Sequence, residues 1–334
     1  MYLNQVFELS MVLDNDTFYK ILGKISSRSD YLEETKEGYI DQTLASKGIL
    51  VMYRDSKYKK KVKLVVNTKL VLDSDALDPD RLIRKLNKRI GQYFDNSCRI
   101  KDFQLSGMVI TVDINVHNHQ NVSAYLKVLQ RIGKVKGFSP SVYEGIDENS
   151  SFCLAGNSNS IEILLYDLQR AIIGQLSRTE ISRKELRSRT EKLEGIIRTE
   201  VRLVKPKAIR AYTDAADVSG QIESLSRKSK DIFQDTLTRV VPRGDFYKKD
   251  KAVEIVRCEV NDSTLRRKML VLLALIPEKK SLYLAQKAMN CRDVEKVMDA
   301  FAKINLSPVT ISKRQDIKCL KSPYSYFIER SNKR

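Results

Sequence analysis

Residues 105–116 have the sequence LSGMVITVDINV, and this stretch is the best starting point for predicting the fold. Its β-branched residues predict a strand over 108–116. Successive side chains of a strand point to opposite faces of the sheet. Ile114 and Val116 are therefore expected to face an apolar core, whereas Asp113 is expected on the other face.

The order of elements around this strand is expected to occur twice. After it, apolar residues at helical spacing predict a helix over 121–132, followed by strands near Phe152 and over 161–168. Before residue 100, the same patterns predict a strand, a helix and two strands, over 6–14, 16–24, 48–53 and 62–72. The repeat concerns element order and not sequence identity. It predicts an α+β fold of two related half-units, residues 1–100 and 101–240, whose strands form one antiparallel sheet.

The C-terminal residues 261–334 are predicted to form a small helical module. Asp262 is placed to cap a helix that Pro277 is expected to end, and two more helices are predicted over 280–289 and 292–304. The segments SPVTISKR and SPYSYF are expected to be extended. Such a module suits DNA binding or docking, and a plain helical C-terminal domain fits the pattern equally well.

The charge of the chain favours a polyanionic partner. Its 334 residues include 60 Lys and Arg against 42 Asp and Glu, a formal net charge of +18. A surface this basic attracts nucleic acid, an anionic membrane face or an acidic protein. Because the basic residues are spread along the chain and not gathered on one amphipathic helix, nucleic acid is favoured over a membrane.

The remaining composition indicates a cytoplasmic protein. No stretch approaches the roughly 20 apolar residues of a membrane span. The N-terminal residues MYLNQVFELSMVLD have no basic segment before an apolar one, so no signal peptide is expected. The five cysteines lie far apart without a CxxC pair, which predicts free thiols in a reducing cytosol.

The only two histidines of the chain, His117 and His119, follow Asp113 closely. If the strand continued through them, all three side chains would share one face with Asn115. An acid and two imidazoles on one face suit a divalent ion, and we expect Mg²⁺ or Mn²⁺ because no thiolate takes part. The alternative is a polar strand end at the surface, with His119 already in the turn before the helix.

Tyr166 ends a predicted strand on the same face as Glu162. A phenol has a pKa of about 10 and can act as a nucleophile where its surroundings assist deprotonation. The alternative is a tyrosine packed at a sheet edge.

Glu200 lies between Arg198 and Arg202 on one face of another predicted strand. Its carboxylate is expected either to form ion pairs with these arginines or to bind a metal ion while the arginines contact phosphates.

Four segments in order, LSGMVITVDINV, KGFSP, GNSNSIEILLYD and IIRTEVRL, resemble the plasmid and filamentous-phage rolling-circle replication initiators, which are HUH-like tyrosine nickases. The resemblance covers residues 105–203. It implies an aspartate-bearing strand (Asp113), a strand ending in the nicking tyrosine (Tyr166) and an R-x-E-x-R-L strand. The sequence departs from the family at Leu168, where lysine is frequent, and at Asn118, where related metal-binding nickases have an apolar residue between two histidines.

The resemblance implies that the protein nicks one strand of an origin through a tyrosine–5′-phosphate intermediate, primes rolling-circle replication and rejoins the ends. The expected partners are origin DNA, single-stranded at the nick, with a host helicase and a second copy of the chain as further expectations. The alternatives are a non-catalytic DNA-binding regulator, an inactive relative and a structural protein of a mobile element. The expected ligands of the metal are Asp113, Glu200, Glu162, His117 and His119, and the expected DNA contacts are Arg198, Arg202, Lys134, Lys136 and Arg170.

Overall fold

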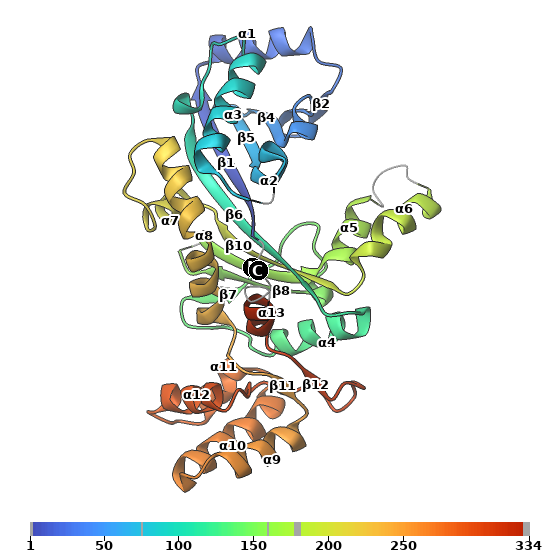
Figure 1. Ribbon diagram of the computed structural model, residues 1–334, viewed down its shortest axis with the longest axis vertical. Helices are drawn as coiled ribbons and strands as arrows, with labels where there is room; N and C mark the ends of the chain where they lie inside the picture. Colours follow the sequence, from blue (N-terminus) through green and yellow to red (C-terminus); the bar gives the residue numbers. More distant parts are fainter. Residues whose placement is uncertain (1–2, 75, 159, 177–181, 330–334) are drawn as a thin grey trace.

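The computed structural model describes residues 3–74, 76–158, 160–176 and 182–329, and over these it has an α+β fold built on one ten-stranded antiparallel sheet (Figure 1). The strand order is β2-β3-β4-β5-β1-β6-β10-β9-β8-β7. The strands are β1 (Asn4–Leu13), β2 (Leu32–Thr35), β3 (Gly38–Asp41), β4 (Ile49–Asp55), β5 (Lys60–Asn67), β6 (Gln104–Asn115), β7 (Phe138–Pro140), β8 (Ser151–Gly156), β9 (Ile161–Asp167) and β10 (Ile196–Leu203).

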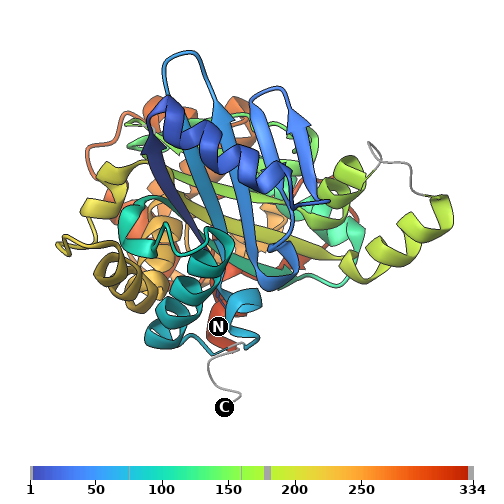
Figure 2. The same cartoon turned by 90° about the horizontal axis from the view of Figure 1, so that it is seen from above.

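Strand β1 makes the sheet continuous across residue 100. It pairs with β5 on one side and β6 on the other, so that Val6 lies opposite both Asn67 and Val109. Strands twist relative to their neighbours, and over ten strands the twist accumulates. Figure 2 shows the result, because the blue strands run at a steep angle to the green strands behind them. The outer strands of the two halves therefore face different directions.

One face of the sheet is packed against helices. The main core joins sheet residues such as Phe7, which lies opposite Met108, to apolar side chains of α1 (Asn15–Ser26), α3 (Pro79–Tyr93), α4 (His119–Gln130) and α8 (Val218–Val240). On the opposite face, residues such as Glu8, Lys63 and Arg198 are polar and half-buried. In β1, β4 and β5 the alternation thus separates an apolar face, which binds the helices, from a polar one, whereas β9 also buries a small apolar cluster on the opposite face.

Short-range signals set the helix starts. Side chains of Asp14, Asp78, Asn118 and Asp217 accept hydrogen bonds from backbone N–H groups in the first turns of α1, α3, α4 and α8. The predicted cap at Asp16 is therefore off by two residues. The strand predicted over 62–72 ends at Asn67, because that side chain caps the short helix α2 (Thr68–Leu72).

Residues 1–100 contain a hairpin that was not predicted. A hairpin of β2 and β3 precedes β4, and its short polar strands were not recognised in the sequence. The remaining helices of residues 1–240 are α5 (Leu168–Leu176), α6 (Arg183–Thr190) and α7 (Pro206–Arg210). Short 3-10 turns lie at Ala45–Lys47, Ile100–Asp102, Glu148–Ser150 and Glu191–Leu193.

The helical module begins earlier than predicted and is longer. It contains α9 (Lys249–Glu259), α10 (Ser263–Lys279), α11 (Leu282–Ala288) and α12 (Val294–Lys303), with β11 (Phe246–Tyr247) paired to β12 (Cys319–Leu320). Pro277 lies within the last turn of α10 and does not end it. The segment SPYSYF, predicted as extended, begins helix α13 (Pro323–Glu329).

This module is held against the second half-unit by hydrogen bonds. The Leu282 N–H donates to the Arg131 carbonyl over 2.7 Å, at the end of α4. The Tyr324 hydroxyl donates to the carbonyls of Leu237 and Val241 at the end of α8, over 3.1 and 2.6 Å. Figure 1 shows α13 returning to the sheet beside α4, while α9–α12 lie below.

Two further predictions concern the cysteines and membrane-spanning segments. All five cysteines are free thiols in the structure. Among the residues described, none of the helices has the length and apolar character that crossing a membrane requires.

Candidate active site

The centre of the candidate site is a hydrogen bond between two neighbouring strands. Tyr166 lies opposite Arg198 in the pairing of β9 with β10, so its ring and the side chain of Glu200, two residues further along β10, share one face. The Tyr166 hydroxyl donates to Glu200 Oε1 over 2.6 Å. Each residue is only 7% exposed, so this short hydrogen bond lies beneath the protein surface.

The charges around this hydrogen bond are paired. Arg202 Nε donates to the second oxygen of Glu200, Oε2, over 2.8 Å. Arg198 forms a two-pronged contact with Asp113, its opposite residue on β6, over 2.8 and 2.9 Å. Strand β10 therefore presents two arginines and one carboxylate in a row, and both arginine side chains remain about 30% exposed.

The surroundings keep Tyr166 protonated in the resting protein. Burial raises the pKa of its phenol, and the neighbouring carboxylate of Glu200 raises it further, whereas the two arginines act in the opposite direction. Glu200 Oε1 already accepts the phenolic hydrogen bond, so it is the group placed to take the proton. A nucleophile in hydrogen-bond contact with a base is the arrangement that nucleophilic catalysis requires.

A second tyrosine covers the site. The Arg202 guanidinium carbon lies 5.4 Å from the centre of the Tyr143 ring, a cation–π contact. Cys153, Leu168 and Ala171 pack with Tyr166 in a small cluster separate from the main core. Tyr143 was missed in the sequence, because it lies in the loop between β7 and β8, where no periodic pattern marks a residue that faces a site.

Glu162 and Cys153 complete this face. Glu162 lies opposite Arg202 in the β9–β10 pairing, and its carboxylate contributes to raising the pKa of Tyr143, second to burial. Burial also raises the pKa of the Cys153 thiol, to about 11. A thiol with this pKa is almost entirely protonated near neutral pH, so Cys153 is a packing residue here and not a nucleophile.

The predicted grouping of His117 and His119 with Asp113 on one strand face is wrong. Strand β6 ends at Asn115, His117 has a backbone φ of 79°, and Asn118 caps α4, whose first residue is His119. The extended alternation on which the prediction depended thus stops two residues before His117. The side chain of His117 is exposed, and His119 lies in a helix, where its side chain contacts Asp167 and not Asp113.

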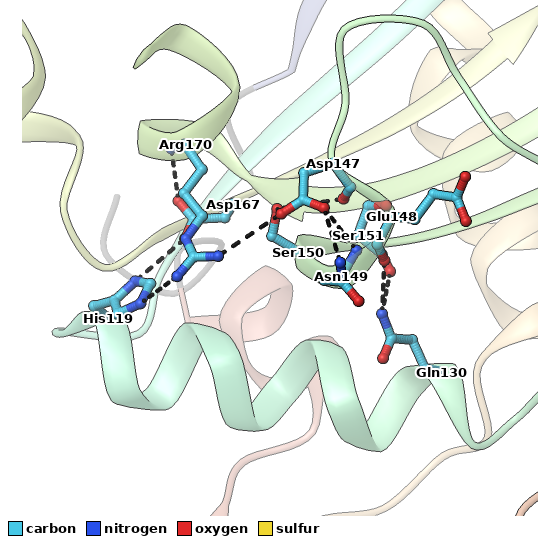
Figure 3. A network of polar contacts seen from close by, with 9 residues as sticks. All are labelled: His119, Gln130, Asp147, Glu148, Asn149, Ser150, Ser151, Asp167 and Arg170. Carbon is cyan, nitrogen blue, oxygen red and sulfur yellow. Dashed lines mark hydrogen bonds and ion pairs between the residues drawn. The ribbon is translucent and has the colours of Figure 1, made fainter. Parts of the chain in front are cut away.

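His119 instead joins a polar network at the N-terminus of α4 (Figure 3). His119 Nδ1 lies 3.3 Å from an Asp167 carboxylate oxygen. Arg170 contacts His119 Nε2 at 3.1 Å and Asp147 at 3.7 Å, and its backbone N–H donates to Asp167. Asp167 follows Tyr166 directly in β9, so its side chain points to the opposite face. The network joins α4, α5 and the loop before β8.

We expect His119→Gln to leave the chemistry of the Tyr166 site intact. The imidazole is 42% exposed and its contact with Asp167 is worth about 1 kcal/mol of unfolding free energy. Denaturant titration should show that small loss. Any reaction of Tyr166 with DNA should stay within about threefold of the unmodified protein, and a loss of a hundredfold would put His119 back in the site.

The predicted metal ligands do not come together in this arrangement. Among the residues that the structure describes, no three His, Cys, Asp or Glu side chains lie close enough to hold an ion jointly. Asp113 is engaged by Arg198, and Glu200 is engaged by both Tyr166 and Arg202. Of the residues predicted to contact DNA, Lys134 and Lys136 are exposed in the loop after α4, far along the sheet from β10.

Comparison with known proteins adds no assignment. A scan of protein-family models matches none of them, and a search of curated proteins finds no match.

Proposed function

We propose that this protein is a replication initiator that cuts one strand of an origin with Tyr166 and rejoins the ends. The observation that carries the proposal is the buried hydrogen bond from the Tyr166 hydroxyl to Glu200, with Arg198 and Arg202 on either side of that carboxylate. A nucleophile, a proton acceptor and two cations are the groups that a phosphoryl transfer to tyrosine needs. The resemblance of residues 105–203 to rolling-circle initiators supports the same reaction.

The proposed step has a simple balance. Glu200 Oε1 takes the phenolic proton, and Tyr166 Oη forms a bond to the scissile phosphorus. The bond from phosphorus to the 3′ oxygen breaks, and that oxygen leaves as a free 3′ hydroxyl after taking a proton from water. The product is a tyrosine–5′-phosphate ester, and the reverse reaction rejoins the strand. Arg198 and Arg202 would stabilise the negative charge that develops on the phosphate oxygens.

The cover over Tyr166 has to move before a phosphate can reach it. The loop of residues 141–147 is held by the Tyr143–Arg202 stacking, by the partly exposed Asp147–Arg170 pair, by the hydrogen bond from the Ser141 N–H to the Cys153 carbonyl and by packing of Tyr143 and Ile146 on the Tyr166 cluster. A phosphate that approaches Arg202 would compete directly with Tyr143 for the guanidinium face. DNA binding and opening of the site are thus coupled in this proposal.

The architecture is compatible with a nickase core of two half-units. In each half-unit a central strand, β1 or β6, leads into a helix, α1 or α4, that contributes to the shared core. We propose that the second half-unit carries the chemistry and that the helical module binds origin DNA or a host helicase. A homodimer would bring two such sites to one origin.

A requirement for Mg²⁺ or Mn²⁺ is proposed from the family resemblance and is tested separately. The residues present do not fit a metal in this arrangement, since Asp113 and Glu200 would first have to release their arginines. If an ion is needed, adduct formation should fall at least tenfold in EDTA and return with Mn²⁺. Equal yields with and without EDTA would remove the metal from the proposal.

The direct test is formation of a covalent complex. Single-stranded DNA from the origin of the element that encodes the protein, labelled at its 3′ end, is incubated with the full chain and run on a denaturing gel. Label that migrates with the protein supports the nickase. The burial of Tyr166 and the complete pairing of its charged neighbours favour one alternative, a non-catalytic DNA-binding regulator, and tight salt-sensitive binding without an adduct would support it.

A further inference from the structure

The hairpin between β4 and β5 is strongly basic and ends in an exposed, hydrogen-bonded turn. Two backbone hydrogen bonds between Ser56 and Lys59 close the turn, and the Ser56 hydroxyl donates to the Lys59 carbonyl over 2.8 Å. The turn holds Lys57 and Tyr58 at its tip. Tyr58 is 89% exposed, more than any other large hydrophobic residue of the part of the chain described. Hairpin loops of the blue strands extend to the top of the view in Figure 2.

Three lysines of this hairpin form no ion pair with a carboxylate of the described residues. Among the described residues, Arg54, Lys60 and Lys63 pair with Glu37, Asp55 and Glu8 respectively. No such ion pair involves Lys57, Lys59 or Lys61 within the same described part. Burial lowers the pKa of Lys61, and the charges of Lys63, Lys59 and Arg54 lower it further. The hairpin is therefore a local excess of positive charge, which an anionic ligand would relieve.

The helix-free face of the same two strands indicates which polyanion fits. Its outward positions are Leu50, Met52 and Arg54 on β4 and Lys61, Lys63 and Val65 on β5. None of these is aromatic, and Tyr58 at the tip is a single exposed ring. The hairpin therefore lacks the row of exposed aromatic side chains on which proteins stack successive bases of single strands. Strand β3 pairs with β4 as far as Arg54 and β1 pairs with β5 from Lys60 onward, so only the turn of residues 56–59 extends beyond the sheet. This turn is narrow enough to enter the major groove of duplex DNA, and lysines contact its phosphates.

We propose that the β4–β5 hairpin is a second DNA-binding surface, which holds duplex DNA by its backbone with the Lys57–Tyr58 tip in the major groove. The proposal rests on the proposed function only in taking DNA as the polyanion. The surface is separate from the Tyr166 site, because β1, β6 and β10 lie between this hairpin and β9 in the sheet. In the reaction, the hairpin surface would bind the double-stranded DNA that flanks the nick site while Tyr166 attacks the single-stranded segment.

The test compares two triple variants of the full chain with equal loss of charge. One is Lys57→Ala/Lys59→Ala/Lys61→Ala, and its control is Lys20→Ala/Lys24→Ala/Lys88→Ala, which removes exposed lysines from α1 and α3 on the helix side. Thermal melting first shows that both variants are folded. Fluorescence anisotropy then measures the dissociation constant for a 30-bp duplex and for a single strand of the same length at several salt concentrations.

We expect the hairpin variant to bind the duplex at least tenfold more weakly, with the control within about threefold of the unmodified protein. The slope of log Kd against log salt should fall by roughly 2 to 3 in the hairpin variant, because each duplex phosphate contact contributes about 0.9. Single-strand binding and adduct formation on single-stranded origin DNA should change less than threefold.

The outcomes separate this inference from the proposed function. Equal weakening by both triple variants would overturn the hairpin surface, even if the adduct forms normally. A larger loss for the single strand than for the duplex would overturn the choice of duplex DNA. A hairpin-dependent loss of duplex binding in a protein that never forms an adduct would uphold the surface and reject the nickase.

Discussion

The Tyr166→Phe variant should form no covalent adduct with origin DNA, a loss of at least a thousandfold. Phenylalanine has no oxygen to attack phosphorus, and among the described residues Tyr166 supplies the only hydroxyl that donates to Glu200. The fold should survive, because only one oxygen is removed from a buried ring. The lost hydrogen bond leaves Glu200 Oε1 short of a donor and should cost about 1–3 kcal/mol of unfolding free energy. The measurement is adduct yield on a denaturing gel, with melting as the check on folding.

Tyr143→Phe is the matched control for this variant. Its ring stacks on Arg202 in the same site, so the substitution removes one phenolic oxygen from the same surroundings. We expect it to retain adduct formation within about threefold. DNA affinity should be unchanged in both variants. An adduct that persists in Tyr166→Phe and disappears in Tyr143→Phe would transfer the nucleophile to the covering loop.

The second large effect is expected for Glu200→Gln. The amide cannot take the proton of Tyr166, whose pKa burial keeps high, so the rate of adduct formation should fall at least a hundredfold. A hundredfold is about 2.7 kcal/mol of activation free energy. The substitution also removes the charge that Arg202 Nε contacts at 2.8 Å, which should cost about 1–3 kcal/mol of stability, since only 9% of the Glu200 side chain is exposed.

Glu8→Gln provides the control for loss of a carboxylate from the polar face. Glu8 pairs with Lys63 at 2.9 Å and is 31% exposed, so its variant should lose less than about 1 kcal/mol and keep the adduct rate. Single-turnover adduct formation and denaturant titration measure the two quantities independently. If Glu200→Gln lost stability but kept the rate, Glu200 would be a structural partner of Tyr166 and another group would take the proton.

The regular elements around the site could be predicted because their signals are local. Alternation of apolar residues placed β6, β9 and β10 to within a few residues, and it correctly put Tyr166 and Glu162 on one face. That Tyr166 and Glu200 meet, in contrast, depends on which strands are neighbours and in what register. Register is a long-range property of the sheet, so the 2.6 Å contact was beyond sequence patterns.

The errors have equally specific causes. His117 and His119 were assigned to a strand face, but a single residue with positive φ and the Asn118 cap end the alternation there. A polar cap and a continuing polar strand face have the same residue types, so the pattern did not distinguish them. The pairing of Asp113 with Arg198 was likewise unforeseen, because the two residues are 85 positions apart.

The most direct test of the account is to locate the DNA on the protein. Trypsin should release residues 137–170 as one peptide, because no lysine or arginine interrupts them, and this peptide contains both Tyr143 and Tyr166. After nuclease digestion of the adduct, fragmentation by mass spectrometry identifies which residue carries the remaining nucleotide. The account predicts a nucleotide on Tyr166. A nucleotide on Tyr143, or on any residue outside this peptide, would contradict it.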